Sequence, residues 1–320
     1  MPEYFFIDDV DVRPLIEGAD NDIRRIVPRN YVLRNDVFNP AQFEKFKEIE
    51  MTTAVEKYKV HNYLGNKEPI KGLFGLEMEI EGVELPQWPS QIWDFKKDGS
   101  LRGAGALEYV FIKPLSLEES IKALNTLNKN MIKNEAEPRF SFRTSVHVHV
   151  NVSDLYKEEV ASFLYLSHLL EDVLVEYSGE VRVGNRFCLR TRDAEGKVDS
   201  MCKWLTDKGM PQLRNDKLKY AAINIVPITT YGSVEFRSLR GTLDIDIIVP
   251  WLEVLSNIKE YSRTKTPKQI AKAIITDRDA LLKQVFGKHL KLFEYPGMDE
   301  DITHAYSLLI EIPYLEIGKS

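Results

Sequence analysis

The chain of 320 residues is poor in cysteine, with only Cys188 and Cys202 present. Their spacing fits neither a zinc motif nor a disulfide framework, so the sequence predicts a protein of a reducing, cytoplasmic environment. No apolar run approaches membrane-spanning length, and the acidic beginning of the chain is unlike a signal peptide. We therefore expect neither a membrane protein nor a disulfide-stabilised secreted domain.

Two nucleotide-binding signatures are also missing. No Gly-x-x-x-x-Gly-Lys-[Ser/Thr] sequence occurs, which excludes a P-loop enzyme, and the glycines of residues 101–106 lack dinucleotide-binding spacing. The formal net charge of −6 argues against general nucleic-acid binding. With 43% hydrophobic and 29% charged residues, the composition is that of a globular chain with one large domain or two modest ones.

The clearest pattern lies in residues 74–81. At the period of a β-strand, three apolar side chains share one face and three carboxylates share the other. The carboxylates are Glu77, Glu79 and Glu81. Such a face is either solvated and paired with basic residues or used to hold cations.

Two further predicted strands carry isolated polar residues. Residues 107–112 are apolar except for Glu108 and a central tyrosine, and residues 142–152 alternate valines with a polar face that holds His147 and His149. A short strand is also predicted over residues 92–96. Each polar face taken alone is more often a solvated sheet surface than a metal site.

A hairpin is predicted from strands over residues 220–226 and 232–239, joined by a short turn. The first strand carries Asn224, and the second carries Glu235 and Arg237 two positions apart on one face. An ordinary ion pair between the last two would also explain their spacing.

Strands that alternate with amphipathic helices predict an α+β fold with a largely antiparallel sheet. Residues 1–70 are expected to form an N-terminal extension, residues 71–265 the main domain and residues 266–320 a helical extension. Helices are expected over residues 40–59, after the capping box Ser116–Glu119, and over residues 156–177, 247–261, 267–286 and 301–311.

Taken together, the polar strand faces indicate one chemistry. A carboxylate-rich, thiol-free ligand set favours Mg²⁺ or Mn²⁺ over zinc. Converging arginines favour phosphate, because the guanidinium group matches phosphate oxygens. A basic, loop-rich segment over residues 179–215 supplies further arginines: Arg182, Arg186, Arg190, Arg192 and Arg214.

The order of these motifs resembles the amidoligase family, which belongs to the carboxylate–amine ligase superfamily with glutamine synthetase and glutamate–cysteine ligase. The resemblance covers about residues 72–260. The motifs that carry it are Phe74-Gly-Leu-Glu-Met-Glu79, Asp98-Gly-Ser-Leu101, Leu107-Glu-Tyr-Val with Pro114, Val146-His-Val-His-Val150, Arg182-x-x-Asn185-x-Phe187-Cys188, Lys219-Tyr-Ala-Ala-Ile-Asn224, and Val234-Glu-Phe-Arg237 with Gly241-Thr242.

The resemblance implies a curved, mainly antiparallel sheet of glutamine-synthetase-like type, with helices on its convex side and ATP and Mg²⁺ or Mn²⁺ on its concave face. It also implies an ATP-dependent ligase that activates a carboxylate as an acyl phosphate, which an amine then attacks. The metal ligands would be Glu77, Glu79, Glu108 and Glu235. The cofactor-binding residues would be His147, His149, Arg182, Asn185 and Asn224, and the catalytic residues Arg237, Glu79 and Arg240.

Two other functions fit the same residues. A metal-dependent hydrolase would use the His-x-His pair with glutamate ligands and no nucleotide. A non-catalytic protein would keep the sheet as a binding or assembly scaffold. For the ligase, the expected partners are a small-molecule or peptide carboxylate and an amine, neither of which the sequence identifies.

Overall fold

The computed structural model describes residues 58–318, apart from residues 104, 195, 212 and 214–219, and the backbone of two short strands, β1 (Phe6–Ile7) and β2 (Val10–Asp11). The expected helix over residues 40–59 and most of the N-terminal extension lie outside the described residues, as do Arg214 and Lys219. None of the described helices is long and apolar enough to cross a membrane.

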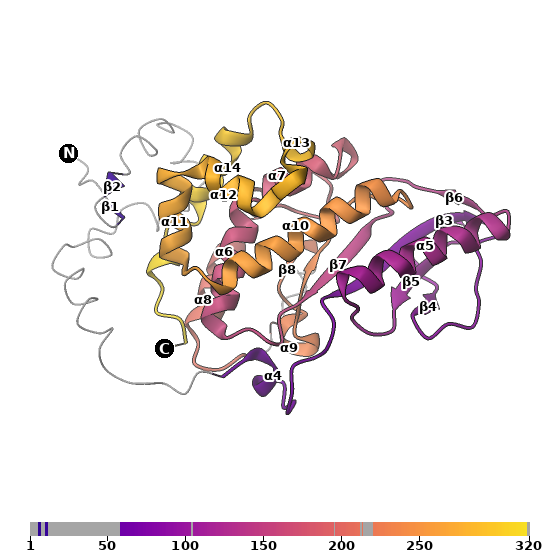
Figure 1. Cartoon of the computed structure of the whole chain (residues 1–320), viewed down its shortest axis with the longest axis horizontal. Coiled ribbons are helices and arrows are strands. Elements are labelled where there is room, and N and C mark those ends of the chain that lie inside the picture. Colours follow the sequence, from indigo (N-terminus) through magenta and orange to yellow (C-terminus); the bar gives the residue numbers. More distant parts are fainter. Residues whose placement is uncertain are drawn as a thin grey trace.

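The centre of the fold is an open seven-stranded sheet with the order β4-β5-β3-β7-β9-β8, to which β6 adds by pairing with β3. Every pair of these strands is antiparallel, which confirms the α+β class and the antiparallel sheet (Figure 1). The strands are β3 (Phe74–Val83), β4 (Trp93–Lys96), β5 (Leu107–Phe111), β6 (Glu137–Arg139), β7 (Val146–Asn151), β8 (Ile223–Asn224) and β9 (Ser233–Phe236).

The side chains on one face of the sheet belong to the hydrophobic core. Leu76 and Met78 of β3, Val148 of β7 and Phe236 of β9 are all fully buried on it. Because alternate residues of a strand point to opposite faces, the glutamates of β3 and the histidines of β7 lie on the other face. The strand register expected from the alternation is therefore confirmed.

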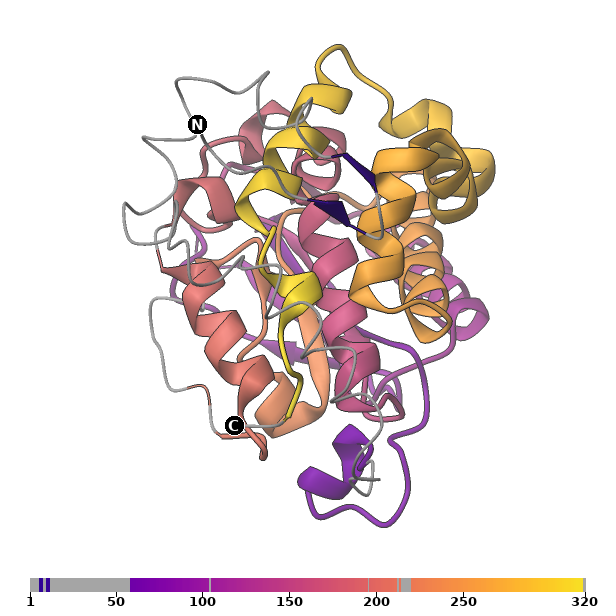
Figure 2. The same cartoon turned by 90° about the vertical axis from the view of Figure 1, so that its left-hand side faces the viewer.

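Helices cover the apolar face. Figure 1 shows α5 (Leu117–Lys133) and α10 (Ile245–Arg263) crossing in front of the strands. Phe163 of α6 (Lys157–Leu169) contacts Phe236 of β9 on the same face. The C-terminal helices α11 (Pro267–Thr276) and α14 (Met298–Leu308) pack against α6 (Figure 2). One continuous core runs from Val60 to Ile312, so the C-terminal helices share it with the sheet.

The remaining helical elements are shorter and line the edges of this layer. They are α4 (Val60–Tyr63), α7 (Glu171–Tyr177), α8 (Lys197–Thr206), α9 (Ile228–Tyr231), α12 (Arg278–Phe286), α13 (Leu290–Phe293) and the 3₁₀ turns η1 (Glu180–Arg182), η2 (Thr191–Asp193), η4 (Gly287–His289) and η5 (Ile312–Tyr314).

Two long helices expected from the sequence are each broken in two. The first breaks at Leu170, which leaves the regular helical conformation and separates α6 from α7. The second breaks at Asp277, whose side chain accepts a hydrogen bond from the backbone N–H of Ala280 and so caps the start of α12. The predicted hairpin is confirmed, although its strands are shorter than expected and α9 forms the connection.

Leu76 on the buried face of β3 contributes to the free energy of unfolding through its burial under the helices. Replacing Leu76 by Ala should lower the free energy of unfolding by about 3 kcal/mol, because a cavity opens under the helical layer. Ile132→Ala on the exposed surface of α5 is the control and should change it by less than about 0.5 kcal/mol. Equal effects in urea denaturation would contradict the assignment of faces.

Candidate functional site

Cross-strand pairing brings the predicted metal ligands together on the polar face of the sheet. Glu77 of β3 pairs with His147 of β7, and His149 of β7 pairs with Glu235 of β9. On the other side of β3, Glu79 pairs with Glu108 of β5. Four strands thus contribute to one row of carboxylates and imidazoles.

Three groups of side chains on this face could each hold a metal ion, with ligand atoms within 4.8 Å of one another. The groups overlap, because Glu77 and Glu108 each belong to two of them. They are Glu77, His149 and Glu235; Glu77, Glu108 and His147; and Glu79, Asp98 and Glu108.

Ser145 restricts the proton positions on His147. The Ser145 hydroxyl donates to Glu79 Oε2 at 2.5 Å, and its oxygen lies 2.7 Å from His147 Nε2. Because the only hydroxyl proton goes to the carboxylate, Nε2 of His147 must donate to the Ser145 oxygen. In a neutral imidazole this leaves Nδ1 as an acceptor without a proton.

Nδ1 of His147 faces two carboxylates. It lies 3.3 Å from Glu77 Oε2 and 3.5 Å from Glu235 Oε1. Ionised carboxylates only accept hydrogen bonds, so three lone pairs point into one space beside a ring that is 4% exposed. A second ring proton or a metal cation is needed to make this arrangement favourable.

His149 and Glu77 form the more accessible part of the face. Nε2 of His149 lies 3.4 Å from Glu77 Oε1, but this contact lacks hydrogen-bond alignment, and Nε2 has no hydrogen-bond partner among the described residues. Burial raises the pKa of Glu77, but hydrogen bonds and positive charge from the His147 and His149 rings, when these carry a second proton, outweigh burial and hold the pKa well below the usual range. Glu77 is therefore ionised at neutral pH.

Glu79 and Glu108 are two carboxylates directly opposite each other, with Asp98 close to both. Burial, followed by the charges of Glu77, Glu79 and Asp98, raises the pKa of Glu108 to about 7. Like charges placed this way repel each other unless a proton or a cation separates them.

Arg237 lies beside the same cluster, as its spacing from Glu235 predicted. Its Nη1 donates to Glu235 Oε1, while Asn224 Nδ2 donates to Glu235 Oε2 at 2.7 Å. Both donors fix the orientation of the Glu235 carboxylate. Nε of Arg237 is buried without a hydrogen-bond partner among the described residues.

Three other predicted site residues, Arg182, Arg240 and Asn185, bind backbone carbonyl groups. Arg182 is fully buried and donates to the carbonyl oxygens of Ser238 and Arg237 at the end of β9. Arg240 donates to the carbonyl oxygen of Tyr177, at the end of α7.

Asn185 joins two loops. Its Nδ2 donates to the carbonyl oxygens of Phe142 and Val181 at 2.9 and 3.0 Å. Its Oδ1 accepts from the backbone N–H of Phe187. This role organises the loops beside the site, and the sequence motif around Asn185 does not reveal it.

Two residues of the cluster were not among the predicted site residues. Ser145 shares the polar face of its strand with both histidines, and the alternation of that strand is the signal that could have identified it. Asp98 begins one of the motifs that carry the family resemblance, but it was not expected to be a ligand. Its proximity to Glu79 and Glu108 depends on how the loop after β4 folds back, for which the sequence carries no periodic signal.

No family model matches the chain, and no curated protein matches it. The resemblance to amidoligases accordingly remains a prediction from the motifs. The geometry of the polar face is the evidence on which a functional proposal depends.

Replacing Glu77 by Gln removes a carboxylate shared by two of the three groups. Mn²⁺ affinity, measured by calorimetric titration, should fall by more than the roughly tenfold loss typical of an outer-sphere partner. Glu118→Gln, on the exposed side of α5, is the matched control and should bind Mn²⁺ normally. Unchanged binding in Glu77→Gln would exclude this face as the metal site.

The raised pKa of Glu108 predicts competition between a proton and a cation. In EDTA the folded protein holds a proton that the unfolded chain has lost, so stability should fall as pH rises from the ordinary carboxyl pKa towards about 7. Mn²⁺ affinity should rise over the interval from about pH 6 to about pH 8, where Glu108 loses its proton.

Glu108→Gln tests this competition, because the amide does not titrate. Both pH dependences should become shallower in this variant, measured by thermal melting and by Mn²⁺ titration. If the wild type and the variant show the same slopes, another group is responsible.

Proposed function

We propose that the protein is a cytoplasmic, ATP-dependent carboxylate–amine ligase whose polar sheet face binds ATP with Mg²⁺ or Mn²⁺. We further propose that the sheet is of the glutamine-synthetase-like type. The observation that carries the proposal is the convergence of His147 Nδ1 with the carboxylates of Glu77 and Glu235, which demands a positive charge. Arg237 beside this point supports a phosphate ligand.

The side chains present fit divalent cations. The three overlapping groups contain five different carboxylates and two imidazoles, and hard cations such as Mg²⁺ and Mn²⁺ prefer oxygen ligands. Ligand atoms about 2 Å from one octahedral ion lie roughly 3 Å from each other. The contacts of 3.3 to 3.5 Å around His147 and Glu77 are close to that spacing. Because the groups share Glu77 and Glu108, the face fits more than one ion.

The first step of the proposed reaction joins two anions. A carboxylate oxygen of the substrate attacks the γ-phosphorus of ATP, ADP leaves, and an acyl phosphate forms. Bound divalent cations would neutralise the phosphate charge. Arg237 would hold the transferred phosphoryl group through its guanidinium edge, which Glu235 already fixes in position.

In the second step the amine attacks the acyl carbon, the carbon–oxygen bond to phosphate breaks, and the ammonium nitrogen loses a proton. Glu79 is the residue we assign as proton acceptor, because the Ser145 hydroxyl orients its carboxylate within the cluster. Glu81 is less suited to this role, since it belongs to none of the three groups that could hold a metal ion.

A metal-dependent hydrolase is the second candidate. It is favoured by the group of Glu77, His149 and Glu235, which combines one imidazole with two carboxylates. Hydrolytic metal sites often use such a three-residue set with a water molecule as the fourth ligand. This reaction would need no nucleotide, so ATP dependence separates the two candidates.

The direct test of the ligase is isotopic. The protein is incubated with ATP, Mg²⁺ and a pool of ¹⁸O-labelled carboxylates and amines, and the products are analysed by mass spectrometry. The proposal predicts an amide that appears only with ATP, together with phosphate that carries one ¹⁸O. Cleavage products that form without ATP would instead favour the hydrolase, and ¹⁸O-free phosphate would contradict the acyl phosphate.

Substitution of Arg237 separates a phosphate-binding role from a structural ion pair. Arg237→Lys keeps the charge but loses the planar fork, so ATP-dependent phosphate release should fall at least about tenfold and, in Arg237→Ala, about 100-fold. Arg237→Lys keeps a cation beside Glu235, so its melting temperature should change little. Arg237→Ala leaves the buried Glu235 carboxylate without that cation and should also lower the melting temperature, so Arg237→Lys is the variant that separates the two roles.

Arg263→Lys is the matched control, since Arg263 pairs with Asp154 and Glu260 in the helical layer. It should keep full turnover. Near-normal turnover in both Arg237 variants of an active enzyme would show that Arg237 is structural.

A further inference from the structure

Three arginines and two aromatic rings alternate in the loops at one end of the polar face. The guanidinium carbons of Arg102 and Arg143 lie 5.3 and 5.5 Å from the centre of the Phe142 ring. Those of Arg143 and Arg186 lie 5.9 and 4.8 Å from the centre of the Phe187 ring. Each ring thus lies close to two guanidinium groups, and we call Arg102, Arg143 and Arg186 the arginine row.

Hydrogen bonds to the backbone hold the three loops of the arginine row together. Nη1 of Arg143 donates to the carbonyl oxygen of Ser100 at 2.9 Å, which joins the loop before β7 to the turn after β4. Asn185 donates to the carbonyl oxygen of Phe142 at 2.9 Å, which joins the same loop to the segment after η1. These hydrogen bonds hold the three loops that carry the row next to one another.

The row adjoins the candidate site. The backbone N–H of Arg102 donates to Glu81 Oε1 at 2.8 Å, on the same strand face as Glu77 and Glu79. Arg143 lies two residues before Ser145, whose hydroxyl bonds Glu79. A ligand with one group on the cluster has the arginine row as its next neighbour.

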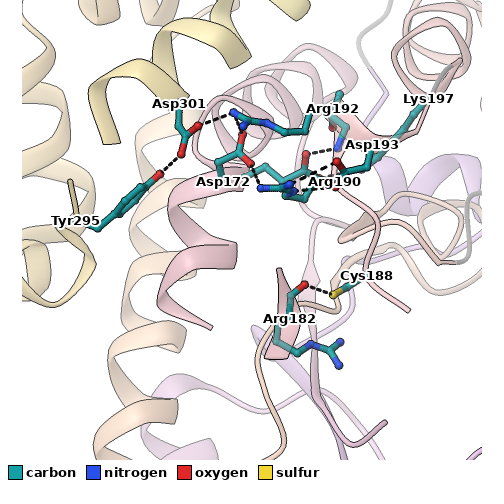
Figure 3. Close-up of polar contacts among 11 residues, drawn as sticks. Asp172, Arg182, Cys188, Arg190, Arg192, Asp193, Lys197, Tyr295 and Asp301 are labelled. Atoms are coloured by element: carbon teal, nitrogen blue, oxygen red, sulfur yellow. Dashed lines mark hydrogen bonds and ion pairs between the residues drawn. The ribbon is translucent and has the colours of Figure 1, made fainter. Parts of the chain in front are cut away.

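No carboxylate pairs with Arg102, Arg143 or Arg186 in the part of the chain that the structure describes. Two other arginines of the same basic segment, Arg190 and Arg192, do pair with carboxylates. Figure 3 shows Arg190 and Arg192 held by Asp172, Asp193 and Asp301, which ties η2 to α7 and α14. In a chain of net charge −6, three clustered arginines without acidic partners indicate a negatively charged ligand.

Exposed guanidinium groups favour an oxyanion as the ligand. Arg102 and Arg186 are exposed and make no ion pair within the described residues, so their N–H groups are available to a carboxylate. Nη1 of Arg143 already donates to the carbonyl oxygen of Ser100. Each ring has two guanidinium carbons within 5.9 Å of its centre, and Phe142 is 45% exposed. The oligonucleotide measurement below therefore separates a carboxylate ligand from a base stacked on this ring.

We propose that the arginine row binds the carboxylates of an acidic peptide. In an extended peptide, side chains two residues apart point the same way at roughly 7 Å, which suits a row of cations. The identification of this peptide as the carboxylate substrate rests on the proposed ligase function, with one further carboxylate placed on the cluster. Binding itself needs neither ATP nor metal.

Fluorescence anisotropy of labelled hexaglutamate with the full chain, in EDTA and without ATP, tests the proposal. We expect saturable binding that weakens with salt, and no binding of labelled hexaglutamine. Arg143→Gln and Arg186→Gln should each raise the dissociation constant at least about fivefold, because each removes a charge-assisted contact. Arg186 is exposed, so its variant should fold even if the Arg143 variant does not.

Arg139→Gln is the control, because Arg139 is exposed and already paired with Glu137. It should bind hexaglutamate as the wild type does. Absence of hexaglutamate binding, equal binding of hexaglutamine, or unchanged binding in Arg186→Gln would each overturn the proposal. Tighter binding of a labelled single-stranded oligonucleotide of six bases would also overturn it, in favour of a phosphate backbone.

The ligase proposal and the peptide-binding proposal can be disproved independently of each other. If hexaglutamate binds but no ATP-dependent amide forms, the row is a binding surface and the ligase proposal is wrong. If the ligase acts but Arg186→Gln leaves its KM for an acidic peptide unchanged, the row does not recognise the substrate.

Discussion

The chemistry of the polar face depends on several hydrogen-bond acceptors that converge on one buried point beside His147. The Ser145 hydroxyl donates a hydrogen bond to Glu79, so Nε2 of His147 must donate to the Ser145 oxygen. Nδ1 of His147 then faces two carboxylates. Such a concentration of acceptors in a buried place is costly unless a positive charge joins it. The same reasoning applies to Glu79 and Glu108, which face each other across two strands.

The strand register places these acceptors on one face of the sheet. Residues of one strand alternate between a face sealed by α5, α6 and α10 and a face that carries the carboxylates, so no glutamate can leave the cluster without moving a core residue. Around the cluster, buried arginines bind backbone carbonyl groups or carboxylates and fix the loops. The clearest cases are Arg182 of η1, which donates to carbonyl groups just after β9, and the ion pairs of Arg190 and Arg192.

The sequence predicted the parts that depend on periodicity. Alternation in β3 and β7 identified which side chains share a face, and the spacing of Glu235 and Arg237 identified their contact. It did not predict the helix breaks at Leu170 and Asp277, which carry no glycine or proline. Asp98 and the arginine row were also missed as parts of a site, because loop positions follow from tertiary packing and not from local pattern.

We expect the convergent acceptors around His147 to hold a divalent cation. Anomalous diffraction from crystals grown with Mn²⁺ and a non-hydrolysable ATP analogue tests this expectation. The electron density should show a manganese peak bonded to Glu77 and to Nδ1 of His147, with the phosphates of the analogue beside Arg237. Manganese absent from this face, with a proton alone between His147 and the carboxylates, would contradict it.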